Sequence, residues 1–272
     1  EGIREDFILA TKSMSRTKDA MAADIDISLK NLRTDYIDLY QIHNATPEQL
    51  QQVMAPGGAL EALLEAKAAG KIGHIGLTSH SLDTFKMALD LDWVETFMFP
   101  YNIVETQAEK LIAECAKRNI GFIDMKPLAG GAIEDATLAL RYICANDAVT
   151  VVIPGMAEPK ELEQNIAAVS NTAPITAEEK AAFLEIRNQL GTNFCRRCNY
   201  CQPCAAGINI SGCFLFDGYL QRYGLGEWAK SRYATIPVKA SACIGCGACE
   251  ARCPYNLPIR DMLKKVAEHF GE

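Results

Sequence analysis

Two periodicities alternate along the first 170 residues of the chain. Short apolar runs, typical of buried parallel strands, predict strands at 7–11, 36–42, 72–78, 95–99, 120–125 and 149–153. Apolar residues at helical spacing predict the intervening helices at about 18–32, 59–69, 82–90, 104–118, 135–145 and 159–169. Such alternation indicates parallel strands joined by right-handed crossovers.

Two folds have this pattern, an open doubly wound sheet and an eight-stranded β/α barrel. No GxGxxG follows any strand, which disfavours the doubly wound, dinucleotide-binding fold. Polar residues recur at the carboxyl ends of strands, where barrel enzymes build their sites, as at Lys12, His43, Thr78 and Lys126. The six βα units fall short of eight. We therefore expect an incomplete (β/α)8 TIM barrel that lacks two units.

Composition and charge narrow the class of protein. The chain has 272 residues, of which 49% are hydrophobic, so it can bury a core. Its net charge of -7 disfavours nucleic acid as a partner. No apolar run approaches the length of a membrane span, and the first residues do not resemble a signal peptide. A cytoplasmic protein without a membrane partner is expected.

The cysteines divide the chain in two. Of eleven cysteines, nine lie between 195 and 253. Residues 193–272 carry ten Lys and Arg against six Asp and Glu, whereas the whole chain is acidic. We therefore expect a barrel domain over 1–192 and a small, mostly α-helical domain over 193–272. A chain without a signal peptide that bunches cysteines in CxxC steps points to metal or iron–sulfur ligation in a reducing compartment.

Two cysteine runs supply eight candidate ligands. The second, CIGCGACEARCP, fits the bacterial ferredoxin pattern CxxCxxCxxxCP, and the first has one residue fewer before its last cysteine. In two-cluster ferredoxins the fourth cysteine of each run ligates the other cluster. This rule predicts two [4Fe-4S] clusters, one held by Cys195, Cys198, Cys201 and Cys253 and the other by Cys243, Cys246, Cys249 and Cys204. Zinc bound by four cysteines is the alternative. Three further cysteines are expected to be buried thiols: Cys115, Cys144 and Cys213.

Several segments, in the same order along the chain, resemble the aldo/keto reductase family. They are ILATKS (8–13), DYIDLYQIH (35–43), GHIGLTS (73–79), PYN (100–102), MKPLAGG (125–131) and IPG (153–155) running on to Asn165. The cysteine runs are similar to those of a branch of the family with an appended ferredoxin-like domain. The resemblance implies a barrel that reduces carbonyl groups with NAD(P)H.

The catalytic residues follow from the same resemblance. The family uses an Asp, Tyr, Lys and His tetrad, in which Tyr gives a proton to the carbonyl oxygen. Lys12 matches the family Lys, and His43 matches the family His. The Asp and Tyr belong to a βα unit that is absent here, so the N-terminal part of the barrel is expected to be missing and the tetrad to be half present.

The cofactor segments depart from the family. Thr78 and Ser79 stand where a Ser-Asn pair holds the nicotinamide carboxamide, and Met125 replaces a Tyr that stacks on the ring. Lys126, Pro127 and Leu128 follow in the same segment. Where the family grips a 2′-phosphate with cations, the sequence has Gly155, Met156 and Glu161, with Asn165 retained. NADPH preference is thus in doubt and NADH becomes an option.

Two functions are compatible with this sequence. The first is an oxidoreductase of the aldo/keto reductase type, acting on a small carbonyl substrate, in which the clusters pass electrons or stabilise the fold. The second is an iron–sulfur electron-transfer protein that uses the barrel as a docking scaffold for an electron-transfer partner. The half-complete tetrad motivates the second.

Overall fold

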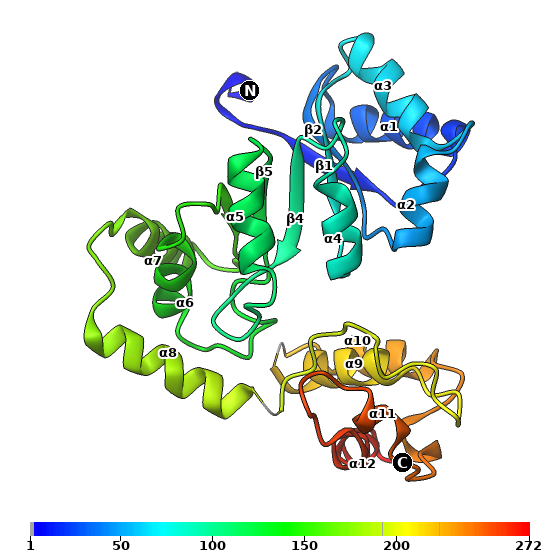
Figure 1. Cartoon of the computed structure of the whole chain (residues 1–272), viewed down its shortest axis with the longest axis vertical. Coiled ribbons are helices and arrows are strands. Elements are labelled where there is room, and N and C mark those ends of the chain that lie inside the picture. The colour runs from blue at the N-terminus through cyan, green and yellow to red at the C-terminus, as the bar shows by residue number, and fades with distance from the viewer. Residues whose placement is uncertain (1–2, 192, 223) are drawn as a thin grey trace. The chain divides into compact units, whose positions relative to one another are not determined.

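The computed structural model describes residues 3–191, 193–222 and 224–272, which fall into two compact units (Figure 1). The sheet unit comprises the residues up to Tyr101, together with Gln107–Met125 and Asn146–Ile153. The cysteine unit comprises Asn102–Thr106, Lys126–Ala145 and Pro154–Glu272. No helix among the described residues is long and apolar enough to cross a membrane.

The sheet unit is built on six parallel strands that form a curled half-barrel. The strands lie side by side in chain order, as crossover connections require. Their bounds are β1 Ala10–Ser13, β2 Ile37–Ile42, β3 Ile72–Thr78, β4 Thr96–Pro100, β5 Gly121–Met125 and β6 Val151–Ile153. These six parallel strands confirm the prediction of an incomplete (β/α)8 barrel.

Helices cover the outer face of this sheet, and the main core of the unit lies between the two layers. They are α1 Lys18–Leu32, α2 Pro47–Met54, α3 Ala59–Ala68, α4 Leu82–Ala88 and α5 Glu109–Lys117. Phe85 of α4 stacks on Phe97 of β4 with ring centroids 4.1 Å apart, and it also contacts Phe99 and Phe122. All four rings are almost inaccessible to solvent. Because successive strand residues alternate between faces, the aromatic side chains of β4 point outward.

Three local expectations differ from the structure. The first strand begins at Ala10, and Phe7 and Ile8 are exposed, because β1 is an edge strand with a single paired neighbour. The helix expected at 104–118 begins only at Glu109, because Asn102 organises a turn ahead of it. Helix α2 was not expected. It begins with a capping box between Thr46 and Gln49, and only Leu50 and Val53 are buried.

The cysteine unit contains the remaining helices. Helices α6 Ala136–Cys144, α7 Pro159–Ser170 and α8 Ala177–Leu190 precede the first cysteine run. Helices α9 Ile210–Arg222 and α10 Gly226–Ala234 separate the runs, and α11 Ala248–Ala251 and α12 Ile259–Phe270 follow within and after the second run. A buried cluster gathers around the cysteines, in which the ring of Tyr233 stacks on Phe270 at 3.8 Å.

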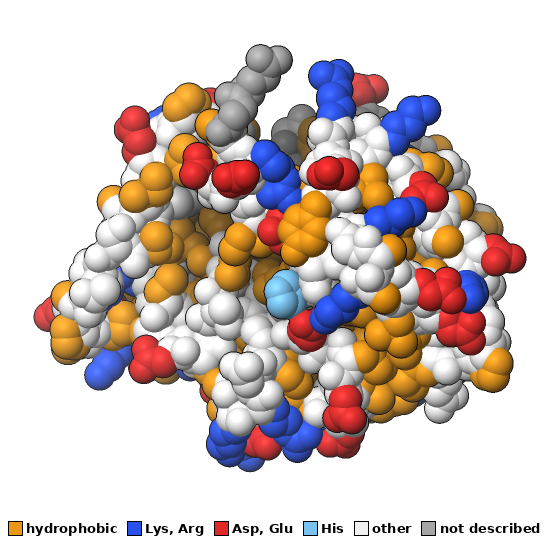
Figure 2. Space-filling view, turned by 90° about the horizontal axis from the view of Figure 1, so that it is seen from above, with side chains coloured by type: hydrophobic (Ala, Val, Ile, Leu, Met, Phe, Trp, Pro, Cys, Tyr) orange, Lys and Arg blue, Asp and Glu red, His pale blue; other side chains and the backbone are white. Residues whose placement is uncertain are grey.

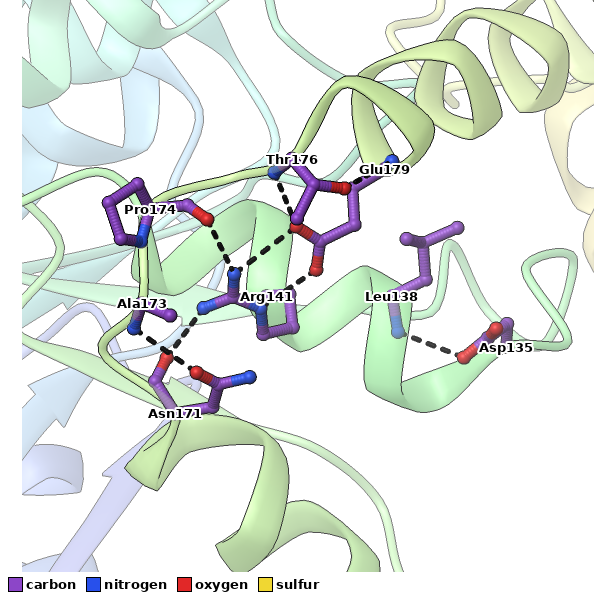
Figure 3. Close-up of polar contacts among 8 residues, drawn as sticks. All are labelled: Asp135, Leu138, Arg141, Asn171, Ala173, Pro174, Thr176 and Glu179. Atoms are coloured by element: carbon purple, nitrogen blue, oxygen red, sulfur yellow. Dashed lines mark hydrogen bonds and ion pairs between the residues drawn. The ribbon is translucent and has the colours of Figure 1, made fainter.

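A buried arginine holds α6, α7 and α8 together (Figure 3). The guanidinium of Arg141 is 6% exposed and pairs with Glu179, with Nε 2.9 Å from Oε1. It also donates to the carbonyl oxygens of Asn171 and Pro174, which end α7 and lead into α8. Glu179 in turn accepts from the backbone N–H of Thr176, so one carboxylate both caps α8 and pairs with α6. Each nitrogen of the buried Arg141 guanidinium thus has a hydrogen-bond partner.

The three cysteines outside the predicted ligand sets do not behave alike. Cys115 and Cys213 are fully buried, as expected. The expectation of a buried thiol at Cys144 is wrong, because this residue is exposed. It follows Ile143, which points into the core, and one step along a helix turns the side chain by about 100° toward solvent.

Charges of both signs are interspersed with hydrophobic side chains over the face drawn in Figure 2. No broad basic area interrupts this mixture there.

Truncation of Phe85 tests how far the sheet unit depends on its aromatic core. We expect Phe85→Ala to lower the free energy of unfolding by about 3–5 kcal/mol, because it removes a fully buried ring and leaves a cavity. The same substitution at Phe7, which is 60% exposed, is the matched control and should change the stability by less than about 1 kcal/mol. Chemical denaturation measures both. Equal losses for the two variants would contradict the assigned core.

Candidate functional site

The strand register places candidate residues on the inner face of the half-barrel. Lys12 pairs with Gln41, and Thr78 pairs with Met98. Paired residues of parallel strands point to the same face. Leu39, Met98 and Ile123 form a buried apolar cluster there, against which Met125 packs. The inner face thus combines an apolar floor with polar groups at the ends of the strands.

Lys12 and His43 come together at the carboxyl ends of β1 and β2. The backbone N–H of His43 donates to the carbonyl oxygen of Ser13 at 2.8 Å, and Arg16 donates to the carbonyl oxygen of His43 at 2.7 Å. Burial lowers the pKa of His43, and the positive charges of Lys12 and Arg16 lower it further. His43 is therefore a neutral imidazole at pH 7, able to donate one hydrogen bond.

Thr78 and Ser79 are both buried and both engaged with the loop after β2. Thr78 Oγ1 accepts from the backbone N–H of Asn44 at 2.8 Å. Ser79 Oγ donates to the carbonyl oxygen of Ala45 at 2.7 Å and accepts from the N–H of Ser81. A hydroxyl has a single hydrogen, so Ser79 has none left to donate. The two residues fix the loop that carries His43.

A buried charged group surrounds Lys126 in the cysteine unit. Asn102 donates both to Glu105 and to the carbonyl oxygen of Lys126, whose backbone is left-handed with φ 61°. Burial raises the pKa of Glu105, against the opposing charges of Arg197 and Lys126. Burial and the positive charge of Arg197 together lower the pKa of Lys126 to about 7. The sequence did not single out Glu105, since nothing in its spacing shows that it is buried.

The predicted 2′-phosphate segment lies at the start of α7. Gly155 is exposed and Asn165 is buried on the helix. Glu161 accepts from the backbone N–H groups of Ala157 and Glu158, in a capping box with Glu158. The Glu161 carboxylate thus already accepts the hydrogen bonds of the backbone N–H groups that a bound anion would use at the start of α7. Pro127 and Leu128 enter a turn closed by a hydrogen bond from Ala129 to Lys126, without a side-chain polar group of their own.

The cysteines approach one another across the two runs. Burial raises the pKa of Cys198, and the neighbouring thiol of Cys253 raises it further. Burial and the thiols of Cys198, Cys249 and Cys253 raise the pKa of Cys201 to about 11. Cys195 responds to Cys201 and Cys198 in the same way. Cys253 of the second run therefore lies near Cys198 and Cys201 of the first run.

The remaining four predicted ligands line one small cavity, to which Cys204 comes from the first run and Cys243, Cys246 and Cys249 come from the second. The backbone at Gly245 and Gly247 is left-handed, with φ 71° and 74°, which the second run needs to wrap around this space. Among the described residues, no three His, Cys, Asp or Glu side chains converge tightly enough for a single metal ion. All these cysteines are free of disulfides.

Two arginines, which the sequence did not single out, fasten the cysteine runs in place. Arg252 donates to the carbonyl oxygens of Cys201 and Pro203, so the second run is bonded to the first. Arg196 lies over the ring of Tyr255 at 4.0 Å and donates to the carbonyl oxygen of Val104. The only sequence signal for these two arginines is that each lies between two of the predicted cysteine ligands.

Comparison with known proteins agrees with this geometry. The sequence model of the Aldo/keto reductase family matches residues 1–138 and 133–188, which together cover more than half of the chain. The chain belongs to the aldo/keto reductase family. The model of a 4Fe-4S dicluster domain matches residues 194–258, the region of both cysteine runs. This aldo/keto reductase therefore carries an iron–sulfur domain, and the match supports iron–sulfur ligation over zinc.

Individual relatives are distant. L-galactose dehydrogenase of Arabidopsis thaliana is 25% identical over 230 residues, covering 67% of this chain and 71% of that protein. An aldo-keto reductase of Bacillus subtilis is 33% identical over 131 residues, which are 43% of this chain and 37% of that protein. The holo form of an aldo-keto reductase from Bacillus halodurans superposes with a TM-score of 0.58 at 26% identity, over 68% of this chain and 74% of that one.

Titration of His43 tests the grouping of charges at the strand ends. We expect its imidazole pKa, measured by NMR, to lie below 6.5, and Lys12→Gln to raise it because one neighbouring positive charge is removed. Since the folded state binds fewer protons than the unfolded state between the two pKa values, the contribution of His43 to stability rises with pH through this window. It is lost as the pH falls below the folded pKa.

A matched substitution on α1, Lys30→Gln, controls for a general change of charge and should leave the titration of His43 in place. A pKa of 6.5 or more in the unsubstituted protein, or equal shifts in both variants, would show that Lys12 does not act on His43.

Proposed function

We propose that this protein is a nicotinamide-dependent oxidoreductase that interconverts a small carbonyl compound and its alcohol, with two [4Fe-4S] clusters held by its cysteine unit. The observation that carries the proposal is the proximity of Lys12 to a neutral His43 at adjacent strand ends, above an apolar floor. Membership of the aldo/keto reductase family supports the same chemistry.

Each group of the half-barrel has a role in this reaction. A bound reduced nicotinamide would supply a hydride to the carbonyl carbon. The negative charge that then develops on oxygen is stabilised by a hydrogen bond from His43 and by the positive charge of Lys12. Met125, packed on the inner apolar cluster, offers a polarizable surface for a ring. Neither Lys12 nor His43 matches the proton-donating Tyr of the family, so the proton that completes the alcohol would come from solvent water.

The two cysteine groups fit the proposed clusters. Cys195, Cys198, Cys201 and Cys253 would hold one cluster, and Cys204, Cys243, Cys246 and Cys249 would hold the other. Support comes from the thiols that influence one another across the runs and from the cavity that the second group lines. We place the boundary between the barrel domain and the iron–sulfur domain at 192/193. The cysteines form no disulfides, which suits the reducing cytoplasm.

The cofactor proposed is NADH rather than NADPH. The carboxylate of Glu161 accepts hydrogen bonds from the backbone N–H groups at the start of α7. A 2′-phosphate at the position that the family resemblance assigns to it would meet this negative charge, with neither of the two cations that the family places there.

Charge reversal at Glu161 tests the cofactor assignment. We expect the unsubstituted protein to bind NADH more tightly than NADPH, measured by quenching of nicotinamide fluorescence. Glu161→Arg should strengthen NADPH binding by about tenfold or more, because a repulsive charge becomes an attractive one. Glu161→Gln keeps a capping side chain and should give an intermediate gain.

Glu163→Arg on the same helix, whose side chain is exposed and outside the capping box, is the matched control and should leave the preference unchanged. Equal gains in the two arginine variants would refute the assigned position. Failure of either nucleotide to bind at all would refute the proposed function itself.

A second candidate function is electron transfer through the clusters with a non-catalytic barrel. The observation that favours it is the exposure of the second cysteine run, where Cys246 is exposed and Ile244 is 68% exposed. Such an edge suits electron exchange with an electron-transfer partner. This function requires that Lys12→Met leave the redox behaviour unchanged, whereas the proposed function requires loss of carbonyl turnover.

A further inference from the structure

The cysteine unit contains a cavity that the proposed function does not use. Its volume is about 210 Å³, smaller than the roughly 300–1,000 Å³ of pockets for drug-sized ligands. Its walls come from α9, α12, the segment before the first cysteine run and the turn after β5. Cys195, a proposed ligand of the first cluster, also lines it.

Positive charge is concentrated in these walls. Lys126, Arg197, Arg222 and Lys265 all line the cavity, in a chain whose net charge is -7. One carboxylate, that of Asp217, is also present, and it is bonded to Nδ1 of His269 at 2.7 Å. Lys126, whose pKa is about 7, is partly charged at neutral pH, and repulsion among these four side chains in so small a space favours entry of an anion.

Arg197 shows the strongest need for such an anion. Its Nε and Nη2 atoms are buried and have no hydrogen-bond partner among the described residues. The nearby Glu105 does not satisfy them, because its own Oε1 also lacks a partner. A buried guanidinium nitrogen without an acceptor is costly, and a carboxylate is the acceptor that fits its planar fork.

Another part of the cavity wall is apolar. Phe194 is 7% exposed, and Phe214, Met262 and Val266 complete this part of the wall. An inorganic anion would leave these side chains without a partner, whereas a carboxylate on a compact apolar body would contact both parts of the wall.

We propose that this cavity binds a small organic carboxylate, whose charge meets Arg197 and Lys265 and whose apolar body packs on Phe194 and Phe214. The inference goes beyond the proposed function, since no step of that function involves the cavity. Its effect on redox behaviour rests on the proposed function: because Cys195 lines the same space, a bound anion would add negative charge beside the proposed first cluster and would make its reduction less favourable.

Calorimetric titration of the cluster-loaded full chain tests the proposal with benzoate as the probe. Benzamide, of the same shape but uncharged, and inorganic phosphate are the comparison ligands. We expect benzoate to bind saturably and more tightly than either comparison ligand. Lys265→Gln should weaken it by about tenfold, the loss expected for one charge-assisted hydrogen bond. The matched control is Lys264→Gln, the neighbouring residue on α12 that does not line the cavity.

A second readout separates binding from structural damage. Benzoate should shift the reduction midpoint of one cluster to a more negative potential in the unsubstituted protein and in Lys264→Gln, but much less in Lys265→Gln. The visible absorption of the clusters should be the same in all three proteins. The proposal is overturned if benzoate does not saturate, if benzamide or phosphate binds as tightly, or if the two lysine variants weaken binding equally.

Discussion

The convergence of thiols from two distant segments constrains the cysteine unit more than any other interaction. Cys204 reaches the cavity lined by the second run, and Cys253 lies beside Cys198 and Cys201 of the first. Neither group can form unless the helices α9 and α10 fold back between the runs. Residues 193–272 are too few to bury a large core, so ligation at this crossing is expected to contribute much of the stability of that region. The bonds of Arg252 to the first run hold the same crossing.

The half-barrel depends instead on burial. Its aromatic layer around Phe85 fixes the helices on the outer face, while the inner face keeps a smaller apolar cluster below the strand ends. This separation of faces explains how Lys12 and His43 are positioned. They lie at the ends of rigid strands, and the loop that carries His43 is bonded to Thr78 and Ser79. The chemistry thus rests on elements that the core already orders.

Most strands and helices could be predicted because each carries its own periodicity, and β3 and α1 begin and end where the pattern places them. The exceptions have local causes. Phe7 and Ile8 are apolar but lie outside the strand at the edge of the sheet, and α2 buries only two side chains, too few to give a periodic signal. The predicted burial of Cys144 was wrong. This residue follows the buried Ile143, but α6 buries only one of its faces and Cys144 lies on the other.

The residues of the candidate site also divide into those that the sequence could predict and those that it could not. The eight cysteines could be named from their CxxC spacing. Lys12 and His43 lie at predicted strand ends, but their catalytic roles came from the resemblance to the family, and all these roles stay predictions. Glu105, Arg197 and the cavity at Cys195 could not be named, because their burial depends on which segments the fold brings together. The hydroxyl of Ser79 illustrates the converse, since only the structure shows that its hydrogen is already used.

The crossed sets of cysteines determine both proposed cluster sites, and iron analysis combined with electron paramagnetic resonance of the reduced protein tests these sets. The unsubstituted protein should contain about eight iron atoms and eight sulfides per chain. Cys204→Ser should lose the same spectral component as Cys246→Ser and keep the one that Cys198→Ser loses, with Cys144→Ser unchanged as the control. A Cys204→Ser spectrum that matches Cys198→Ser, or a protein that binds zinc in place of iron, would contradict the account.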